Sequence, residues 1–306
     1  MDTSNSLQKV LVPIAVDKPA ESLLLLSYAG QFAAVFGAGL LLLHSTNTEE
    51  LTLPEQNRKL SHLRTLGQRV LGRLPTNNTA VPFDCLVRPG KLKDGVKAVV
   101  QEAGVDLVLM QAEAYPEAGK VGAANNAAGV MEQVSCPVMV VPTAQPFKRM
   151  KHLVFATDFT DSDPKVLAQI KHFADQAGAA MSLVQVYSAA ERGQLNQMKE
   201  AKAGIEKQLG GRKVSLQLLE AEDTLEGISS FAEREQADLV VLATQDSYLM
   251  QRLFSEAYIE MKAYHTHIPL LTYRQHKSKP CSGCCTACKK AKQEHQETTP
   301  LQLPLL

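Results

Sequence analysis

The stretch DLVLM at Asp106–Met110 decides the fold, because a near copy of it, DLVVL, returns at Asp238–Leu242. The segment CPVMVV that begins at Cys136 is likewise matched by IPLLTY from Ile268, and the members of both pairs lie 132 residues apart. Equal spacing of two separate matches indicates an internal duplication. Since only two copies occur, we predict two repeats of one unit and not a solenoid.

Short apolar runs alternate with longer helical patterns, which is typical of strand–helix–strand units in a parallel sheet. Near-continuous apolar strands indicate that helices cover both faces of such a sheet. The predicted fold class is therefore α/β, Rossmann-like, with two tandem doubly wound parallel five-stranded sheets. The predicted strands are Val10–Val12, Leu40–Leu43, Phe83–Val87, Leu107–Met110 and Val138–Val141 in the first half, and Leu153–Phe155, Met181–Val186, Val214–Leu218, Leu239–Leu242 and Leu270–Tyr273 in the second. The helices predicted for the first half are Ala20–Phe36, Glu55–Leu74, Leu92–Ala103 and Asn125–Ser135.

A length of 306 residues corresponds to about two domains. We expect the first domain over residues 8–143, the second over 150–274, and an irregular tail over 275–306 that has no periodic apolar pattern. Lys plus Arg and Asp plus Glu number 32 each, so the chain has no formal net charge. That balance argues against a nucleic-acid partner, which normally requires a basic excess.

Residues 22–48 contain no Asp, Glu, Lys or Arg and invite the hypothesis of a membrane span. Gly30, Gly37 and Gly39 interrupt the run, so we expect a helix that ends near Gly37 and a buried strand after it. The N-terminus does not resemble a secretory signal, and six cysteines are too few for a disulfide scaffold. A cytoplasmic protein without a membrane partner is the expectation.

The duplicated order of strands and helices resembles tandem universal stress proteins. The resemblance covers roughly residues 8–274 and rests on several short motifs in the same order in both halves. These motifs are VLVPI from Val10, FATDF from Phe155, the Gly37-Ala38 and Gly178-Ala179 turns, Gly90, and the repeated fourth and fifth strands quoted above. The resemblance implies a stress-response or regulatory role and pairing of the two halves as an intramolecular pseudo-dimer, through the edge strands Val138–Val141 and Leu270–Tyr273. A homodimer and protein partners are compatible with it.

Members of that family that bind ATP carry a Gly-x2-Gly-x9-Gly-Ser/Thr loop after the fourth strand, and an Asp after the first. Small residues there let backbone N–H groups approach phosphates. This chain departs from the motif in both halves, and carboxylates in the second loop would repel phosphate. The resemblance therefore implies degenerate loops that do not bind ATP. The corresponding positions are Gln111, Ala114, Ala124 and Asn125 in the first half, and Ala243, Asp246, Glu256 and Ala257 in the second.

The Asp position is Ala15 in the first half and Asp158 in the second. Asp158 is therefore the candidate nucleotide-binding residue for an alternative function, a nucleotide sensor that uses a remodelled site. The competing interpretation is a loop or helix-cap aspartate, the commoner role of Asp before a helix.

The tail contains Cys281, Cys284, Cys285 and Cys288, four thiols within eight residues. Four thiolates are the ligand set of a tetrahedral zinc ion or an iron–sulfur cluster, so these residues are the candidate metal ligands. On one helix they would span about 10 Å, and a single ion requires a looped segment instead. Dithiol redox chemistry and an exposed tail with no chemical role are the other two interpretations.

No G-x-S-x-G, H-E-x-x-H or G-x4-G-K-[ST] motif occurs in the chain. The sequence therefore predicts a regulatory protein without enzymatic turnover. A nucleotide sensor at Asp158 and a metal or thiol-redox module in the tail remain the alternatives.

Overall fold

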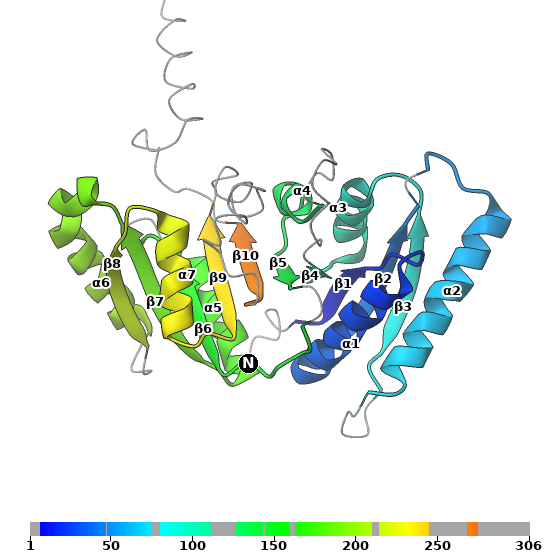
Figure 1. The fold of residues 1–306 in the computed structure, drawn as a ribbon, viewed down its shortest axis with the longest axis horizontal. Helices are drawn as coiled ribbons and strands as arrows, with labels where there is room; N and C mark the ends of the chain where they lie inside the picture. Colours follow the sequence, from blue (N-terminus) through cyan, green and yellow to red (C-terminus); the bar gives the residue numbers. More distant parts are fainter. Residues whose placement is uncertain are drawn as a thin grey trace, which may run out of the picture.

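The computed structural model describes residues 7–46, 48–74, 80–111, 126–142, 145–159, 163–209, 214–244 and 268–274. Strands and helices alternate through both halves (Figure 1). The first half contains β1 (Lys9–Pro13), α1 (Pro19–Phe36), β2 (Gly39–Ser45), α2 (Leu53–Leu71), β3 (Phe83–Arg88), α3 (Leu92–Ala103), β4 (Leu107–Gln111), α4 (Asn126–Gln133) and β5 (Val138–Val141).

The second half repeats this order as far as the structure describes it. Its elements are β6 (His152–Ala156), α5 (Pro164–Ala177), β7 (Ala180–Tyr187), the 3-10 helix η3 (Ala189–Gln194), α6 (Leu195–Leu209), β8 (Ser215–Glu220), α7 (Thr224–Arg234), β9 (Leu239–Thr244) and β10 (Leu270–Arg274). The strand bounds differ from the sequence prediction by at most two residues. The helix after β2 begins earlier than predicted, because the backbone N–H of Thr52 donates to the carboxylate of Glu55 and fixes the first turn there.

The ten strands in the described ranges form one sheet, in the order β3-β2-β1-β4-β5-β10-β9-β6-β7-β8. The two predicted parallel five-stranded sets are therefore parts of one mixed sheet. Each half contributes five parallel strands, but β5 pairs with β10 in the antiparallel direction and joins the two sets. The physical reason is that each half ends in an apolar edge strand, and an edge left unpaired would invite aggregation. The expected meeting of these two strands is confirmed.

Helices cover both faces of the sheet, as predicted. Alternate side chains of each strand enter different cores: Val10 and Val12 pack on the face covered by α1, α2, α5 and α6, whereas Leu11 packs on the face covered by α3, α4 and α7. Both cores contain residues of both halves. The two halves therefore share their hydrophobic interior and are not merely connected by the linker.

Helices α1 and α5 make the main helical contact between the halves. The ring of Phe173 on α5 stacks against Phe36 of α1 at a centroid distance of 4.8 Å, and against Phe32 at 6.4 Å. Phe32 and Phe173 are at most 3% exposed. Such large buried rings supply much of the apolar area that a junction of this kind removes from water.

The aspartates of the repeated DLV motif have the same structural role in both halves. The carboxylate of Asp106 accepts hydrogen bonds from the backbone N–H groups of Gln8 and Lys9, where β1 begins. Asp238 accepts the corresponding bonds from Lys151 and His152, where β6 begins. The aspartate of each DLV segment thus fixes the start of the central strand of its half.

The uncharged run over residues 22–48 forms α1 and β2, as the sequence predicted. None of the helices in the described ranges has the length and apolar character needed to cross a membrane.

Candidate functional site

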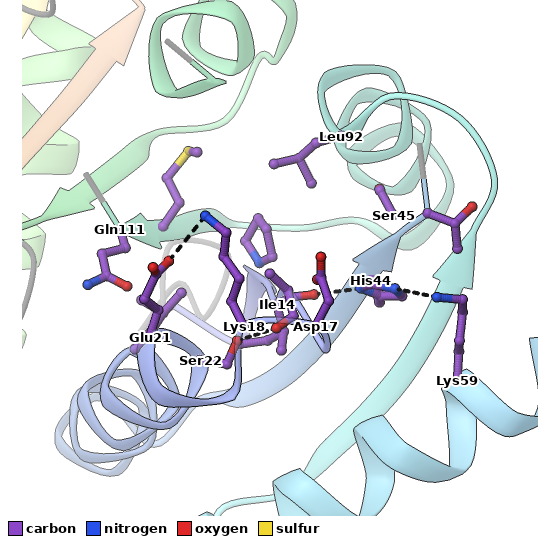
Figure 2. A pocket seen from close by; sticks show the side chains of 15 residues that line it. Ile14, Asp17, Lys18, Glu21, Ser22, His44, Ser45, Lys59, Leu92 and Gln111 are labelled. Atoms are coloured by element: carbon purple, nitrogen blue, oxygen red, sulfur yellow. Dashed lines mark hydrogen bonds and ion pairs between the residues drawn. The ribbon is translucent and has the colours of Figure 1, made fainter. Parts of the chain in front are cut away.

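A cavity of about 350 Å³ lies at the carboxyl ends of β1, β2 and β4 in the first half (Figure 2). Ligands of open α/β sheets bind at this edge, where the strand order reverses between β1 and its neighbours. The cavity volume is at the lower end of the range for small-molecule sites. The apolar part of the wall comes from Pro13, Ile14, Ala15, Leu25, Leu92 and Met110, and the polar part from Asp17, Lys18, Glu21, Ser22, His44, Ser45, Thr46, Lys59 and Gln111.

The loop from β1 to α1 forms the floor of this cavity and is held by backbone contacts. The N–H of Ile14 donates to the carbonyl oxygen of Leu43 on β2, at 2.7 Å. The hydroxyl of Ser22 donates to the carbonyl oxygen of Ala15 at 2.6 Å. Because both ends of the loop are fixed in this way, the side chains that it carries face the cavity in a defined position.

His44, at the end of β2, is a buried polar group of the cavity wall, with 4% of its surface exposed. Its Nδ1 lies 2.9 Å from the carbonyl oxygen of Ile14, and its Nε2 lies 3.5 Å from Nζ of Lys59. A neutral ring that donates from Nδ1 to Ile14 and accepts at Nε2 from the ammonium satisfies these two contacts. The N–H of Val16 also lies 3.4 Å from Nδ1, a longer contact than the one with Ile14. Burial lowers the pKa of His44, and the contact with Ile14 opposes that change only in part.

Because His44 is held neutral, the pH dependence of folding has a defined sign. The unfolded chain takes up a proton near the ordinary histidine pKa of about 6.5, whereas the folded chain resists it. Stability is therefore expected to fall as the pH drops below about 6.5 toward the lowered pKa of the folded state.

The substitution His44→Gln should reduce this dependence of the free energy of unfolding on pH, as measured by urea unfolding at a series of pH values. His62→Gln, an exposed histidine change on α2, is the control and should retain the wild-type slope; an unchanged slope in His44→Gln would contradict the assignment.

Two lysines in the cavity wall have different partners. Nζ of Lys18 lies 3.6 Å from a carboxylate oxygen of Glu21, in an exposed ion pair. Nζ of Lys59 contacts the neutral ring of His44 and forms no ion pair within the described part of the chain. Figure 2 shows the two ammonium groups on opposite sides of the cavity. The positive charge of Lys59 is therefore available to a ligand.

Asp158, the sequence-predicted nucleotide residue, lies in the matching loop of the second half and not in this cavity. Its carboxylate accepts a hydrogen bond from Nε2 of Gln185 at 3.1 Å, and Oε1 of Gln185 accepts one from the N–H of Phe159 at 3.0 Å. Gln185 lies near the end of β7, as His44 lies near the end of β2. Asp158 is thus a loop residue directly before Phe159, and the residue that caps α5 is Asp163. Its role toward nucleotides stays a prediction.

A family model for universal stress proteins matches residues 7–142. These residues form a universal stress protein domain. The solved structure of a universal stress protein from Archaeoglobus fulgidus DSM 4304 is similar to the chain with a TM-score of 0.62 and 14% identity, over 90% of this chain and 100% of that one. A protein of unknown function from Pseudomonas aeruginosa PAO1 is similar with a TM-score of 0.58 and 17% identity, over 90% and 95%. No curated protein matches the chain in sequence.

At these identities the structural likeness shows the fold of the chain and nothing further. It extends over both halves, whereas the family match covers the first. The cavity lies inside the universal stress protein domain, at the end of the sheet where that family's motif residues lie.

Of the motif positions that follow the fourth strands, Gln111 and Ala243 are described. Gln111 lines the cavity, and Ala243 lies at the end of β9 beside Tyr273 of β10. The remaining positions, Ala114, Ala124, Asn125, Asp246, Glu256 and Ala257, lie outside the described residues, as do the four tail cysteines, Cys281, Cys284, Cys285 and Cys288. Metal or redox chemistry in the tail therefore stays a prediction. Within the described ranges no group of three or more His, Cys, Asp or Glu side chains is placed to hold a metal ion.

The two cysteines of the described body have little nucleophilic character. Burial raises the pKa of Cys85 to about 11 and that of Cys136 to about 12. Both side chains therefore remain protonated thiols at neutral pH, and the thiolate is the reactive form.

Sequence reasoning did not identify His44 or Lys59. The only local signal for His44 is a single histidine directly after the apolar run Leu40–Leu43. Lys59 has no such signal, because α2 carries several basic residues and only its packing against β2 selects one of them.

Proposed function

We propose that this chain is a tandem universal stress protein that acts in a stress response by binding and regulation, without turnover, and that the cavity in its first half is the ligand site. The observation that carries the proposal is the chemistry of this cavity. Among its described residues, both ring nitrogens of His44 are engaged, and Lys18 is paired with Glu21. A general base needs a free lone pair within reach of substrate, which a histidine held in this way does not offer.

The tandem part of the proposal is supported by the register between β5 and β10. Met139 pairs with Leu271, which lies 132 residues later, and Val138 and Val140 pair with Thr272 and Leu270 in reversed order. This pattern is what a twofold axis between two copies of one unit produces: the equivalent central residues face each other and their neighbours exchange partners. We therefore treat the two halves as an intramolecular pseudo-dimer.

The loss of the family's phosphate loop predicts that ATP does not bind tightly. Native mass spectrometry of the full chain, purified without added nucleotide, is expected to show no ATP- or AMP-sized adduct. With a dissociation constant above 1 mM, 1 mM ATP would stabilise the fold by less than about 0.4 kcal/mol, or about 1 °C in Tm. A retained nucleotide, or a Tm increase of many degrees, would contradict the proposal and favour the sensor alternative. In that event, Asp158→Asn decides whether the second half holds the nucleotide.

A further inference from the structure

The helix N-termini of the two halves are capped differently. In the second half, the Asp163 carboxylate accepts from the N–H of Lys165 at the start of α5, and that of Asp223 accepts from Leu225 and Glu226 at the start of α7. In the first half, the corresponding cap positions of α1 and α3 are Lys18 and Lys91, and neither makes a side-chain cap. A lysine has no acceptor to offer, so the first N–H groups of both helices have no side-chain cap at these positions.

The cavity lies against these two uncapped helices. Lys18 and Leu92, at the first turns of α1 and α3, are part of its wall. An uncapped helix start favours a negative group, but by itself it does not make a site. Two further observations, both at the end of β2, point to a ligand.

The first observation is the ammonium of Lys59, which has no ion-pair partner within 4 Å in the described part of the chain. It lies at a half-buried position on α2, 3.5 Å from Nε2 of His44. At His44 the ammonium of Lys59 lowers the pKa more than the carboxylate of Asp17 raises it. Burial is the largest cause of the lowered pKa of His44 and keeps the imidazole neutral. The ring therefore does not neutralise the charge of Lys59 or of Asp17.

The second observation is the hydroxyl of Ser45. Its Oγ is buried and has no hydrogen-bond partner among the described residues. It lies against the first turn of α3, because a Cβ at Gly95 would be only 2.9 Å from it. A buried polar atom without a partner is costly, and a ligand that supplies the missing hydrogen bond removes that cost.

We propose that this cavity binds a small molecule with a carboxylate or phosphate group, and that this anionic group lies over the carboxyl end of β2. There, Lys59 approaches from one face of the sheet, and Ser45 and the first turn of α3 approach from the other. The apolar body of the ligand would pack against Ile14, Leu92 and Met110. The inference deepens the proposed function and rests on it. It places the anion at the end of β2 and not on the loop after β4.

Nuclear magnetic resonance titration of the full chain tests the charge requirement with three probes: benzoate, inorganic phosphate and benzamide. Benzoate and phosphate are expected to shift the amide signals of residues 44–46 and 92–95, with affinities that weaken as salt is added. Benzamide has the same ring without the charge and is expected to bind at least tenfold more weakly than benzoate. Equal binding of benzamide and benzoate would overturn the anion assignment while leaving a ligand cavity in place.

Variants locate the anion. Lys59→Met should weaken benzoate binding at least tenfold, Lys59→Arg should restore most of it, and Arg58→Met, which removes the same charge from the neighbouring position, should change it less than twofold. Lys91→Asp would give α3 the cap that Asp223 gives α7, so it should raise Tm and weaken binding at least tenfold. Lys97→Asp, at an exposed position further along α3, is its matched control.

Because Lys91→Asp stabilises the fold while it weakens binding, loss of binding there cannot come from unfolding. Binding that is insensitive to both Lys59→Met and Lys91→Asp would overturn the inference, and so would the absence of shifts with all three probes. Neither result decides the proposed function, which is tested separately by the ATP measurement.

Discussion

Replacing Phe173→Ala is expected to lower the free energy of unfolding by about 3–5 kcal/mol, the usual cost of removing a buried phenyl group from a packed core. The ring of Phe173 is 3% exposed and stacks on Phe36 of the other half at 4.8 Å. Its loss would open a cavity between α1 and α5 that neither helix can fill alone. Urea unfolding followed by circular dichroism measures the change.

The control for Phe173→Ala is Phe83→Ala on the outer edge strand β3. Phe83 is only half-buried and lies far from the junction, so a smaller cost of about 1–2 kcal/mol is expected. A cost below 1.5 kcal/mol for Phe173→Ala would show that the halves do not depend on this contact. Unfolding of the wild-type chain in two separate steps would show the same.

The second large effect is expected at the strand pair that joins the halves. Met139 and Leu271 are fully buried, face each other across β5 and β10, and belong to the same core. Met139→Ala and Leu271→Ala should each cost about 2–5 kcal/mol. Since the two side chains are direct cross-strand neighbours, their double variant should deviate from additivity by about 0.5–3 kcal/mol.

The control for this double variant is Met139→Ala combined with Leu216→Ala, whose separate effects on the free energy of unfolding are expected to add. Leu216 is a buried residue of β8, which lies five strand spacings, or about 24 Å, from β5 along the sheet. Sites that far apart are expected to add within about 0.5 kcal/mol. If the Met139–Leu271 pair were equally additive, β5 and β10 would not form the continuous junction described above.

The parts of the fold that could be predicted from the sequence are those that each segment encodes by itself. Leu107–Met110 was predicted as a strand because four consecutive apolar residues between turn signals must be buried on both faces, and β4 spans Leu107–Gln111. The 3-10 helix Ala189–Gln194 was not predicted, because its residues carry no apolar periodicity. It begins where the N–H of Ser188 donates to Glu191, a capping pattern without a hydrophobic run behind it.

Joining of the two sheets, by contrast, depends on contacts that no single segment encodes. Apolar runs at Val138–Val141 and Leu270–Tyr273 indicate two edges in need of cover, but whether they cover each other within one chain depends on where α1 and α5 bring them. The same limit applies to the cavity. His44 and Lys59 lie 15 residues apart on different elements, and only the packing of α2 on β2 places their side chains in contact.

Family motifs directed attention to Asp158 because they describe where a nucleotide binds in other members. In this chain the carboxylate of Asp158 accepts a hydrogen bond from Gln185, whereas the equivalent loop of the first half borders a cavity with a free positive charge. This difference between the two halves is visible only when both loops are compared in three dimensions.

Hydrogen–deuterium exchange of the full chain tests most directly whether the ten strands behave as one unit. If they do, the slowest amides of β4 in the first half and of β9 in the second should exchange through the same global opening. Phe173→Ala should then accelerate amide exchange in β4 and in β9 by the same factor, although Phe173 lies in the second half and β4 in the first. Acceleration confined to β6–β9, with β4 unchanged, would contradict the account and show two independently folding halves.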